Sequence, residues 1–446
     1  MAKYPATQTS PNPGDGDGSL ANPALNSGQP GDMGTSGSAQ FVDWMIVLCL
    51  GFAVPLASLF RGHWLEYFLP VGLFFTILHL KRYHVSWGDY VAAIPRVAFV
   101  FVGALIVLGL VAALRVFDLI TPVEQAKFIA APFILYFAFY GVMFFIMIRG
   151  TALASKVIWG MFWGALAAYL ILVAEPLTGL VSEGLFPLTH KTGFYSLSHL
   201  NRTFLALSLV SWLAAPWLAK RYGSALYGLL LPLAIWLLNF SGDSETVLIG
   251  MAPALLVYLL AIWLPRLTLH GVFAAVILLL FVAPVIYPYV FQLSLNLPAT
   301  DKLGILVRTE IWDGVAGFIG QSPLIGHGMQ ATQHTSSIEM ANLYYPDTKI
   351  NHPHNGFLHV WADLGVLGAF ALAGIFWSLW HWIGKLGDAD LPGVLAVFTF
   401  AIAAYVSTYS LWAPWWMGLL AMIIAYCIVA TGAKRTNENP DGAGVS

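Results

Sequence analysis

Two histidines and an asparagine lie close together in the stretch NHPHNGFLHVWADLGVLG, residues 351–368. An imidazole readily exchanges a proton near neutral pH, with an unperturbed pKa of about 6.5. Pro353 disfavours helix at His352, and Asn355 is a good helix cap, so His354 and Asn355 are predicted to mark the start of a helix. His354 at that position suits general-base chemistry, or a simpler hydrogen bond at the helix end. A metal site has weak support, because the motif offers two histidines and no third ligand.

Two arginines, Arg202 and Arg308, stand at the borders of apolar segments. The planar guanidinium fork binds phosphate oxygens in pairs, and each charge-assisted contact at a low-dielectric edge contributes about 1.5–3 kcal/mol. Two arginines from separate segments therefore suit a diphosphate. An equally weighted alternative is that both side chains extend along apolar surface to place their charges in water.

The composition places the chain in a membrane. Hydrophobic residues make up 59% of the 446 residues, charged residues make up 9%, and the mean hydropathy is +0.75, which is incompatible with a water-soluble globular protein. The formal net charge is -2 without a basic stripe, so no nucleic-acid partner is predicted. The two cysteines, Cys49 and Cys427, lie in apolar runs and are expected to have a packing role.

Apolar runs long enough to cross a bilayer, about 17–25 residues each, recur from Phe41 onward. The predicted fold is therefore an all-α polytopic membrane protein with about twelve transmembrane helices, and eleven or thirteen also fit. The predicted spans are 41–60, 66–80, 92–114, 128–148, 157–175, 203–219, 224–240, 247–264, 271–293, 357–380, 392–409 and 414–432.

Basic residues in the short loops predict the orientation. With the amino-terminal tail in the cytoplasm, most loop Lys and Arg residues fall inside, and the short outer loops hold Arg61, Arg115 and Lys127. This orientation divides the chain into a disordered cytoplasmic tail at 1–40, transmembrane helices 1–9 at 41–293 with a short outer segment at 176–202, a large outer loop at 294–355 with the candidate catalytic residues, transmembrane helices 10–12 at 356–432, and a cytoplasmic tail at 433–446.

The large outer loop contains a predicted helix of its own. In GILVRTEIWDGVAGFIGQSPLIGHG, apolar residues recur at helical spacing until a Ser-Pro break. The segment is therefore predicted to be an amphipathic helix over about 305–319, with Arg308 in its first turn.

Three stretches carry a resemblance to a known family. HNGFLHVWADLGVLGA, from His354 onward, is similar to the signature of bacterial O-antigen ligases, in which a histidine and a small polar residue are followed by nine residues and a Gly-x-x-Gly pair. The pair here is Gly365 and Gly368, followed by Ala369 where the family usually has Gly or Thr. SHLNRT resembles the family's arginine at the outer end of a span. VRTEIWDGVAGFIGQSPLIGHG resembles its Arg-x-x-x-Trp helix and Pro-Leu-x-Gly-x-Gly.

One stretch departs from the family. In SGDSETVLIG, Ser244 and Glu245 stand where many relatives have Ser-Arg, so no arginine role is transferred there. The family's roles transfer to Arg202, Arg308 and His354, which the residue chemistry had already selected.

The resemblance implies a GT-C-type glycosyltransferase in the bacterial inner membrane, with a periplasmic active site. Such a ligase transfers a glycan from undecaprenyl pyrophosphate to the lipid A core oligosaccharide and inverts the anomeric carbon. It implies that Arg202 and Arg308 bind the diphosphate, that His354 orients or deprotonates the acceptor hydroxyl, and that Asn355 supports this placement. No cofactor or metal is expected, because the first outer loop, RGHWLE, offers one carboxylate, Glu66.

Other functions stay open. O-antigen polymerases and protein O-oligosaccharyltransferases share the donor chemistry and differ in the acceptor. A flippase or transporter of lipid-linked sugars would place ionisable groups in mid-span or show related halves. Neither feature is evident, because Glu175 and Asp363 fall near a span end or within the signature. The sequence leaves the donor glycan, the acceptor sugar and the oligomeric state open.

Overall fold

A computed structural model describes residues 37–59, 74, 77–78, 96–131, 152–181, 201–240, 244–296, 304–334, 338–344, 350, 352–408, 410 and 412–437. The described residues from Val42 onward belong to one compact unit. The predicted tails lie mostly outside the described residues. The first described helix begins at Gly37 and the last ends at Asn437, so these two helices cross the predicted tail boundaries.

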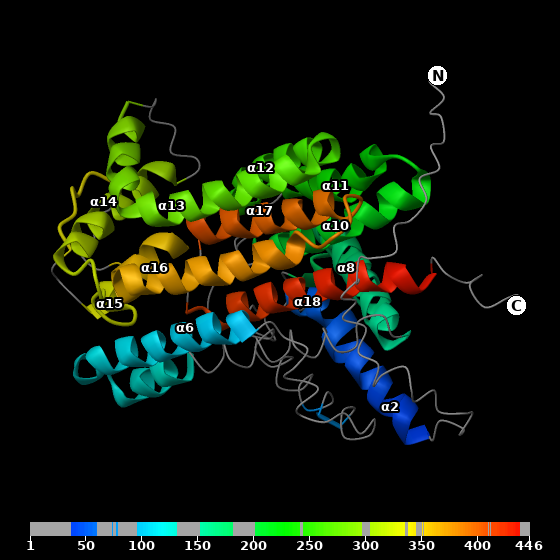
Figure 1. The fold of residues 1–446 in the computed structure, drawn as a ribbon, viewed down its shortest axis with the longest axis horizontal. Helices are drawn as coiled ribbons and strands as arrows, with labels where there is room; N and C mark the ends of the chain where they lie inside the picture. The colour runs from blue at the N-terminus through cyan, green and yellow to red at the C-terminus, as the bar shows by residue number, and fades with distance from the viewer. Residues whose placement is uncertain are drawn as a thin grey trace, which may run out of the picture. The chain divides into compact units, whose positions relative to one another are not determined.

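The regular structure is all α-helical over the described residues, as predicted (Figure 1). A π-helical turn at Val47–Phe52 joins the first two helices, and short 3-10 helices lie at Phe117–Leu119 and Ala225–Leu229. The α-helices are α2 (Gly37–Ile46), α3 (Ala53–Ala57), α6 (Arg96–Arg115), α8 (Ala152–Thr178), α10 (Asn201–Tyr222), α11 (Leu230–Asn239), α12 (Glu245–Trp263), α13 (Pro265–Ser294), α14 (Ile305–Gln321), α15 (Ala331–His334), α16 (Gly356–Ile383), α17 (Leu391–Ser407) and α18 (Pro414–Asn437).

Within the described part of the chain, six helices are long and apolar enough to cross a membrane, namely Gln40–Ala57, Ala152–Glu175, Asn201–Ala219, Glu245–Trp263, Pro265–Ser294 and Gly356–Ile383. Shorter apolar helices occupy Phe99–Arg115, Ala225–Asn239, Leu391–Ser407 and Trp415–Ala430. The predicted spans at 66–80 and 128–148 lie almost wholly outside the described residues. A multi-pass membrane protein is therefore supported, whereas the count of twelve and the GT-C architecture stay predictions.

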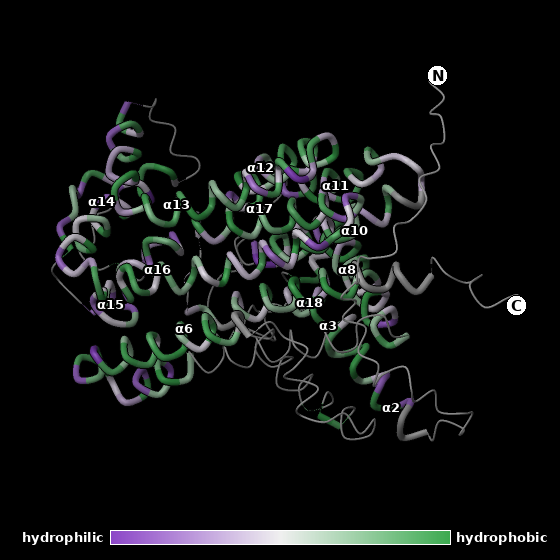
Figure 2. The backbone as a smooth tube through the Cα atoms, in the orientation of Figure 1, coloured by the Kyte–Doolittle hydropathy of each residue, from purple (hydrophilic) through white to green (hydrophobic). Residues whose placement is uncertain are grey.

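The long helices expose large apolar side chains. On α13, Leu278, Val285 and Leu293 are 63%, 65% and 67% exposed. A helix facing water would carry polar residues on that side, whereas one facing lipid need not. Figure 2 shows hydrophobic residues around α12, α13 and α17 without a continuous polar face. This distribution matches a protein surrounded by hydrocarbon.

Glycines allow the central helices to approach closely. Helix α12 packs along α17, and Gly250 of α12 lies against the Phe400 ring. Helix α10 also packs on α17, with Gly393 at the start of α17 against Pro216. Because Pro216 lies in the second half of α10, the two helices run antiparallel. The start of α10 therefore lies toward the end of α17.

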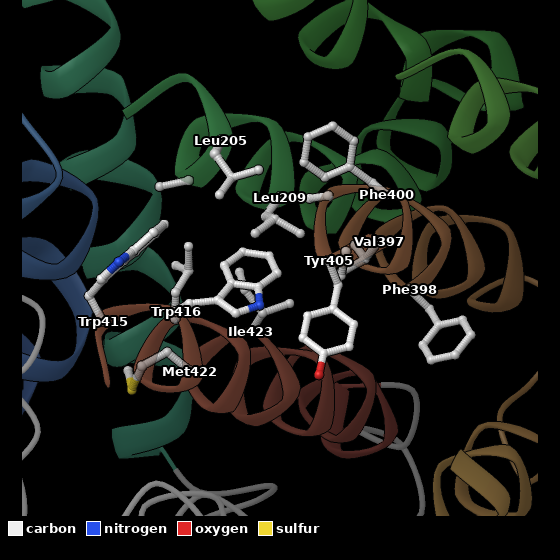
Figure 3. Close-up of a cluster of buried hydrophobic side chains, with 14 of the residues drawn as sticks. Leu205, Leu209, Val397, Phe398, Phe400, Tyr405, Trp415, Trp416, Met422 and Ile423 are labelled. Carbon is white, nitrogen blue, oxygen red and sulfur yellow. The ribbon is translucent and has the colours of Figure 1, made fainter. Parts of the chain in front are cut away.

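Aromatic residues fill the core between α10, α17 and α18. Figure 3 shows Tyr405 of α17 and Trp416 of α18 pointing into one cluster with Leu205 and Leu209 of α10. Trp416 and Leu205 are 0% exposed. Both cysteines of the chain are buried in helical segments, in agreement with the packing role expected for them.

The predicted amphipathic helix is confirmed as α14. It buries Ile311, Val315, Phe318 and Ile319, and it ends at Gln321 immediately before the Ser-Pro break. Helix α14 packs against α13 and α16, so one of its faces is buried.

Candidate functional site

The start of α16 is fixed by Asn355, which is 0% exposed. Its Oδ1 accepts hydrogen bonds from the backbone N–H groups of Phe357 at 3.0 Å and Leu358 at 3.1 Å, so the predicted helix cap is confirmed. The preceding residue, His354, has a left-handed backbone with φ of 52°. Its N–H donates to Nδ1 of His352 at 3.2 Å. This turn holds the His354 side chain at the helix end.

The imidazole of His354 is enclosed by neighbouring residues. Its ring centroid lies 4.0 Å from that of His352, and it also interacts with the backbone of Thr408 at the end of α17. Burial, reinforced by the Arg308 charge, lowers the pKa of His354 to about 4. Burial, with smaller effects from His354 and His359, lowers the pKa of His352 to about 3. Both pKa values lie below the 6.5 expected from the sequence alone, so both rings are neutral near pH 7.

Arg308 lies in the first turn of α14 and forms an ion pair with Glu245, the first residue of α12, at 2.6 Å between Nη2 and Oε2. The two side chains are 20% and 23% exposed. The stretch from which no family role was transferred thus supplies a carboxylate partner for the predicted phosphate-binding arginine. A guanidinium held by a side-chain partner is more ordered than one that merely extends toward water.

Arg202 lies in the first turn of α10. Its guanidinium carbon sits 4.9 Å from the centroid of the Trp415 ring, a cation–π contact with the start of α18. This contact orients Arg202 and is compatible with both hypotheses from the sequence. An arginine on an aromatic ring can serve either as an interfacial anchor or as a phosphate ligand.

The structure brings three of the four predicted site residues together. Arg308 is close enough to His354 to affect its titration, and Asn355 follows His354 directly. The hydroxyls of Thr246 on α12 and Thr408, directly after α17, contact each other, which joins the start of α12 to the end of α17. Arg202 lies toward the same end of the bundle through the antiparallel packing of α10 on α17. Histidines at 190 and 199, in the predicted outer segment, lie outside the described residues.

Residues around Arg308 fix the position of α14. The Thr309 hydroxyl lies 2.9 Å from that of Ser294, at the end of α13. The buried Glu310 carboxylate accepts backbone hydrogen bonds from Leu343 at 2.9 Å and Tyr344 at 2.7 Å. These polar contacts hold the first turn of α14, and thus Arg308, against the helix bundle.

Helix α16 is interrupted at Gly365, where φ is 64° and ψ is -157°. A Cβ atom at this position would lie 2.4 Å from the carbonyl carbon of Leu324. The backbone angles and the close approach both require glycine. The span predicted as one continuous run over 357–380 is therefore broken near its start, and Gly365 has a structural reason to be in the signature.

The loop at 322–328, which contains the Pro-Leu-x-Gly-x-Gly stretch, fills this break. Backbone groups freed by a broken helix need new partners inside a membrane protein. Three hydrogen bonds supply them, from Val366 N–H to the Pro323 carbonyl at 2.9 Å, from His327 N–H to the Ala362 carbonyl at 2.8 Å, and from Gly328 N–H to the Asp363 carbonyl at 3.1 Å. Two of the stretches that carry the family resemblance therefore fit each other.

A buried histidine–aspartate pair lies next to the break. His359 Nε2 is 3.1 Å from Asp363 Oδ2, and both side chains are almost fully buried. The same carboxylate oxygen accepts from Trp412 Nε1 at 2.7 Å and from the Gln330 N–H at 2.9 Å. Asp363 therefore joins α16 to the segment before α18 and to the loop before α15. Sequence reasoning did not assign this role, and an acidic residue within an apolar helix was the available signal.

Residues 227–373 match a family model described as O-antigen ligase. The resemblance to the O-antigen ligase family is confirmed. The matched segment contains Arg308, His354, Asn355 and the break at Gly365, and it begins after Arg202.

Two relatives of this ligase-like chain are named "Putative polysaccharide ligase". The protein from Rickettsia bellii is 25% identical over 235 residues, which cover 50% of this chain and 56% of the relative. The protein from Rickettsia conorii is 24% identical over 284 residues, which cover 60% of this chain and 66% of the relative. The alignments thus span about half to two thirds of either protein.

Among the residues that the structure describes, no group of three His, Cys, Asp or Glu side chains could hold a metal ion. Metal-independent chemistry in this O-antigen ligase relative stays a prediction.

Proposed function

We propose that the protein transfers a glycan from undecaprenyl pyrophosphate to a hydroxyl of the lipid A core, on the periplasmic side of the bacterial inner membrane, with the GT-C-type architecture. The observation that carries this proposal is the cluster of Arg308, His354 and Asn355 inside the segment that matches the O-antigen ligase model. The cluster combines a cation for a diphosphate with a neutral imidazole for a hydroxyl.

In the proposed reaction, the acceptor oxygen attacks the anomeric carbon while the bond from that carbon to the diphosphate oxygen breaks. The electron pair of the broken bond goes to the diphosphate, and the configuration inverts. Arg308 and Arg202 bind the phosphate oxygens and offset the charge that develops on the leaving group. The guanidinium fork suits this task because it pairs with two oxygens at once.

The acceptor hydroxyl must also lose a proton. Nδ1 of His354 is buried and has no hydrogen-bond partner within the described structure. In the neutral ring, the nitrogen that donates to the Thr408 backbone carries the hydrogen, so Nδ1 keeps a lone pair that can accept from the acceptor hydroxyl. A pKa of about 4 makes His354 a weak base, which favours orientation of the hydroxyl with proton transfer late in the reaction. Asn355 contributes by fixing the helix end. Its Oδ1 caps α16 and therefore binds the backbone rather than the substrate.

The test uses the purified protein with one lipid-linked glycan and three separate acceptors: lipid A core, a second copy of the lipid-linked glycan, and a serine-containing peptide. A ligase extends lipid A core. Extension of the glycan or the peptide instead would identify a polymerase or a protein oligosaccharyltransferase. If no acceptor is extended and the donor crosses vesicle membranes, the protein is a transporter. Each reaction is repeated in excess chelator, where we expect transfer to persist, and restoration of lost activity by magnesium or manganese would contradict metal independence.

A further inference from the structure

The ion pair between Glu245 and Arg308 joins the starts of two helices. The side-chain amide of Asn239 donates to the backbone carbonyl of Ser244 at 3.0 Å, which fixes the residue before α12. Glu245 then lies in the first turn, where the helix dipole favours a negative charge. Gly304, in the left-handed conformation before α14, lies beside the Glu245 carboxylate. Backbone contacts therefore fix the helix starts that carry Glu245 and Arg308.

The pair is also accessible to a ligand. Side chains that are 20% and 23% exposed are partly desolvated, so the charges attract each other more strongly than on a fully exposed surface. A carboxylate and a phosphate present similar oxygen acceptors to a guanidinium. A diphosphate that reaches Arg308 therefore meets a carboxylate already bound to the same group.

We propose that Glu245 is a positioning residue that orients Arg308 before the diphosphate binds and competes with the diphosphate for its guanidinium, so that it limits how tightly the lipid diphosphate product is held. The proposal rests on the proposed function, in which Arg308 binds the donor diphosphate. The donor carries a sugar on its terminal phosphate, whereas the product does not. The freed phosphate ionises a second time with a pKa of about 6, which adds negative charge. Repulsion from Glu245 therefore acts more strongly on the product than on the donor.

The competition predicts a change in binding that needs no turnover. Undecaprenyl diphosphate is titrated into the purified full-length protein in detergent, with undecaprenol as the control that lacks phosphate. Removing the charge in Glu245→Gln is expected to lower the Kd for undecaprenyl diphosphate about three- to tenfold, the range of a partly screened ion pair. Glu245→Asp keeps the charge and is expected to bind within about twofold of the wild type.

Asp313→Asn is the matched control. Asp313 also lies on α14 and is partly buried, so this variant removes a nearby negative charge without removing the partner of Arg308. We expect its Kd to stay near the wild-type value. Glu245→Ser provides a second charge-free variant if Glu245→Gln does not fold, and thermal melting in detergent verifies each protein.

Under turnover, Glu245→Gln is expected to show a lower KM for the donor, stronger inhibition by added undecaprenyl diphosphate, and a kcat that falls if product release limits the rate. A merely structural role would instead weaken binding in Glu245→Gln. That result, an unchanged Kd, or an equal gain in Asp313→Asn would overturn the proposal. If the lipid diphosphate binds as expected and no acceptor is extended, the proposed transfer fails while the competition at Arg308 stands.

Discussion

At the scale of single residues, the candidate site depends on contacts that His354 and Arg308 make with residues distant in the sequence. His354 and Arg308 were selected by residue type and by their positions at predicted helix starts, and the structure places them in electrostatic contact. The partner of Arg308 could not be predicted, because Glu245 is 63 positions away in a stretch that departs from the family. The lowered pKa of His354 could not be predicted either, because burial depends on tertiary packing.

His354→Ala is expected to lower the transfer rate about 10²- to 10⁴-fold if the imidazole handles the acceptor proton. His352→Ala removes one hydrogen bond to the backbone of His354, which contributes about 0.5–1.5 kcal/mol, so its loss should not exceed about tenfold. Initial rates at equal amounts of inserted protein measure both. Near wild-type transfer by His354→Ala with a large loss in His352→Ala would reverse the two roles.

The pH profile tests the environment of His354. The neutral imidazole is the active form, and its pKa of about 4 means that activity should stay level from pH 8 to about pH 5 and fall below that. The unfolded chain takes up protons on histidine near pH 6.5, before the folded chain does, so His354 also makes the folded state lose stability as the pH falls from about 6.5 toward 4. Melting curves at each pH separate unfolding from titration. A midpoint of activity near pH 6.5 in folded protein would show that the ring is solvated.

Lysine substitutions test the arginines. Arg308→Lys and Arg202→Lys keep the positive charge and lose the planar fork, so each should lower kcat/KM for the donor by about tenfold or more. Arg202→Lys also weakens the contact with Trp415, and Trp415→Phe, which keeps an aromatic ring, is its control. If either lysine variant works nearly as well as the wild type, that arginine serves as an interfacial anchor and leaves the proposed site.

At the scale of elements, periodicity predicted the helices but not the break in α16. The apolar pattern of 305–319 was sufficient to predict α14, because one helix face repeats along the sequence. The break at Gly365 depends instead on the loop at 322–328, which was predicted to lie in the large outer loop but not to contact this helix. Arg115 holds that loop through Nη1, which donates to the Gly326 carbonyl at 2.6 Å across 211 positions. Such distant hydrogen bonds leave no periodic signal.

Gly365→Ala tests the break. Alanine at φ of 64° and ψ of -157° is strained, and its Cβ would collide with the Leu324 backbone. We expect a loss of about 2–5 kcal/mol in the free energy of unfolding. Gly317→Ala is the control, because that helical glycine on α14 has open space around it and alanine favours helix. Thermal melting in detergent compares the two, and equal stability of Gly365→Ala and the wild type would mean that the loop can move away.

At the scale of the whole molecule, three helix ends indicate how the described helices run, and the sidedness of the predicted topology stays a prediction. The start of α12, the end of α17 and the start of α16 meet at one end, as alternate crossings of a membrane require. Arg266 lies at the other end, in the first turn of α13, and forms an ion pair with Asp388 at 2.9 Å. The number of crossings stays a prediction, because the predicted spans at 66–80 and 128–148 lie almost wholly outside the described residues.

Cysteine labelling decides the sidedness. Gly320 on α14 and Gly387 between α16 and α17 are both exposed, with open space for a side chain, so each can be replaced by cysteine without a clash. Cys49 and Cys427 are buried and give a low background. The positive-inside rule places the start of α13, with Arg266, on the cytoplasmic side. A membrane-impermeant maleimide, applied to cells with a permeable outer membrane, should therefore label Gly320→Cys at once and Gly387→Cys after the inner membrane is lysed. The opposite order would put the candidate site in the cytoplasm, where a periplasmic ligase cannot work.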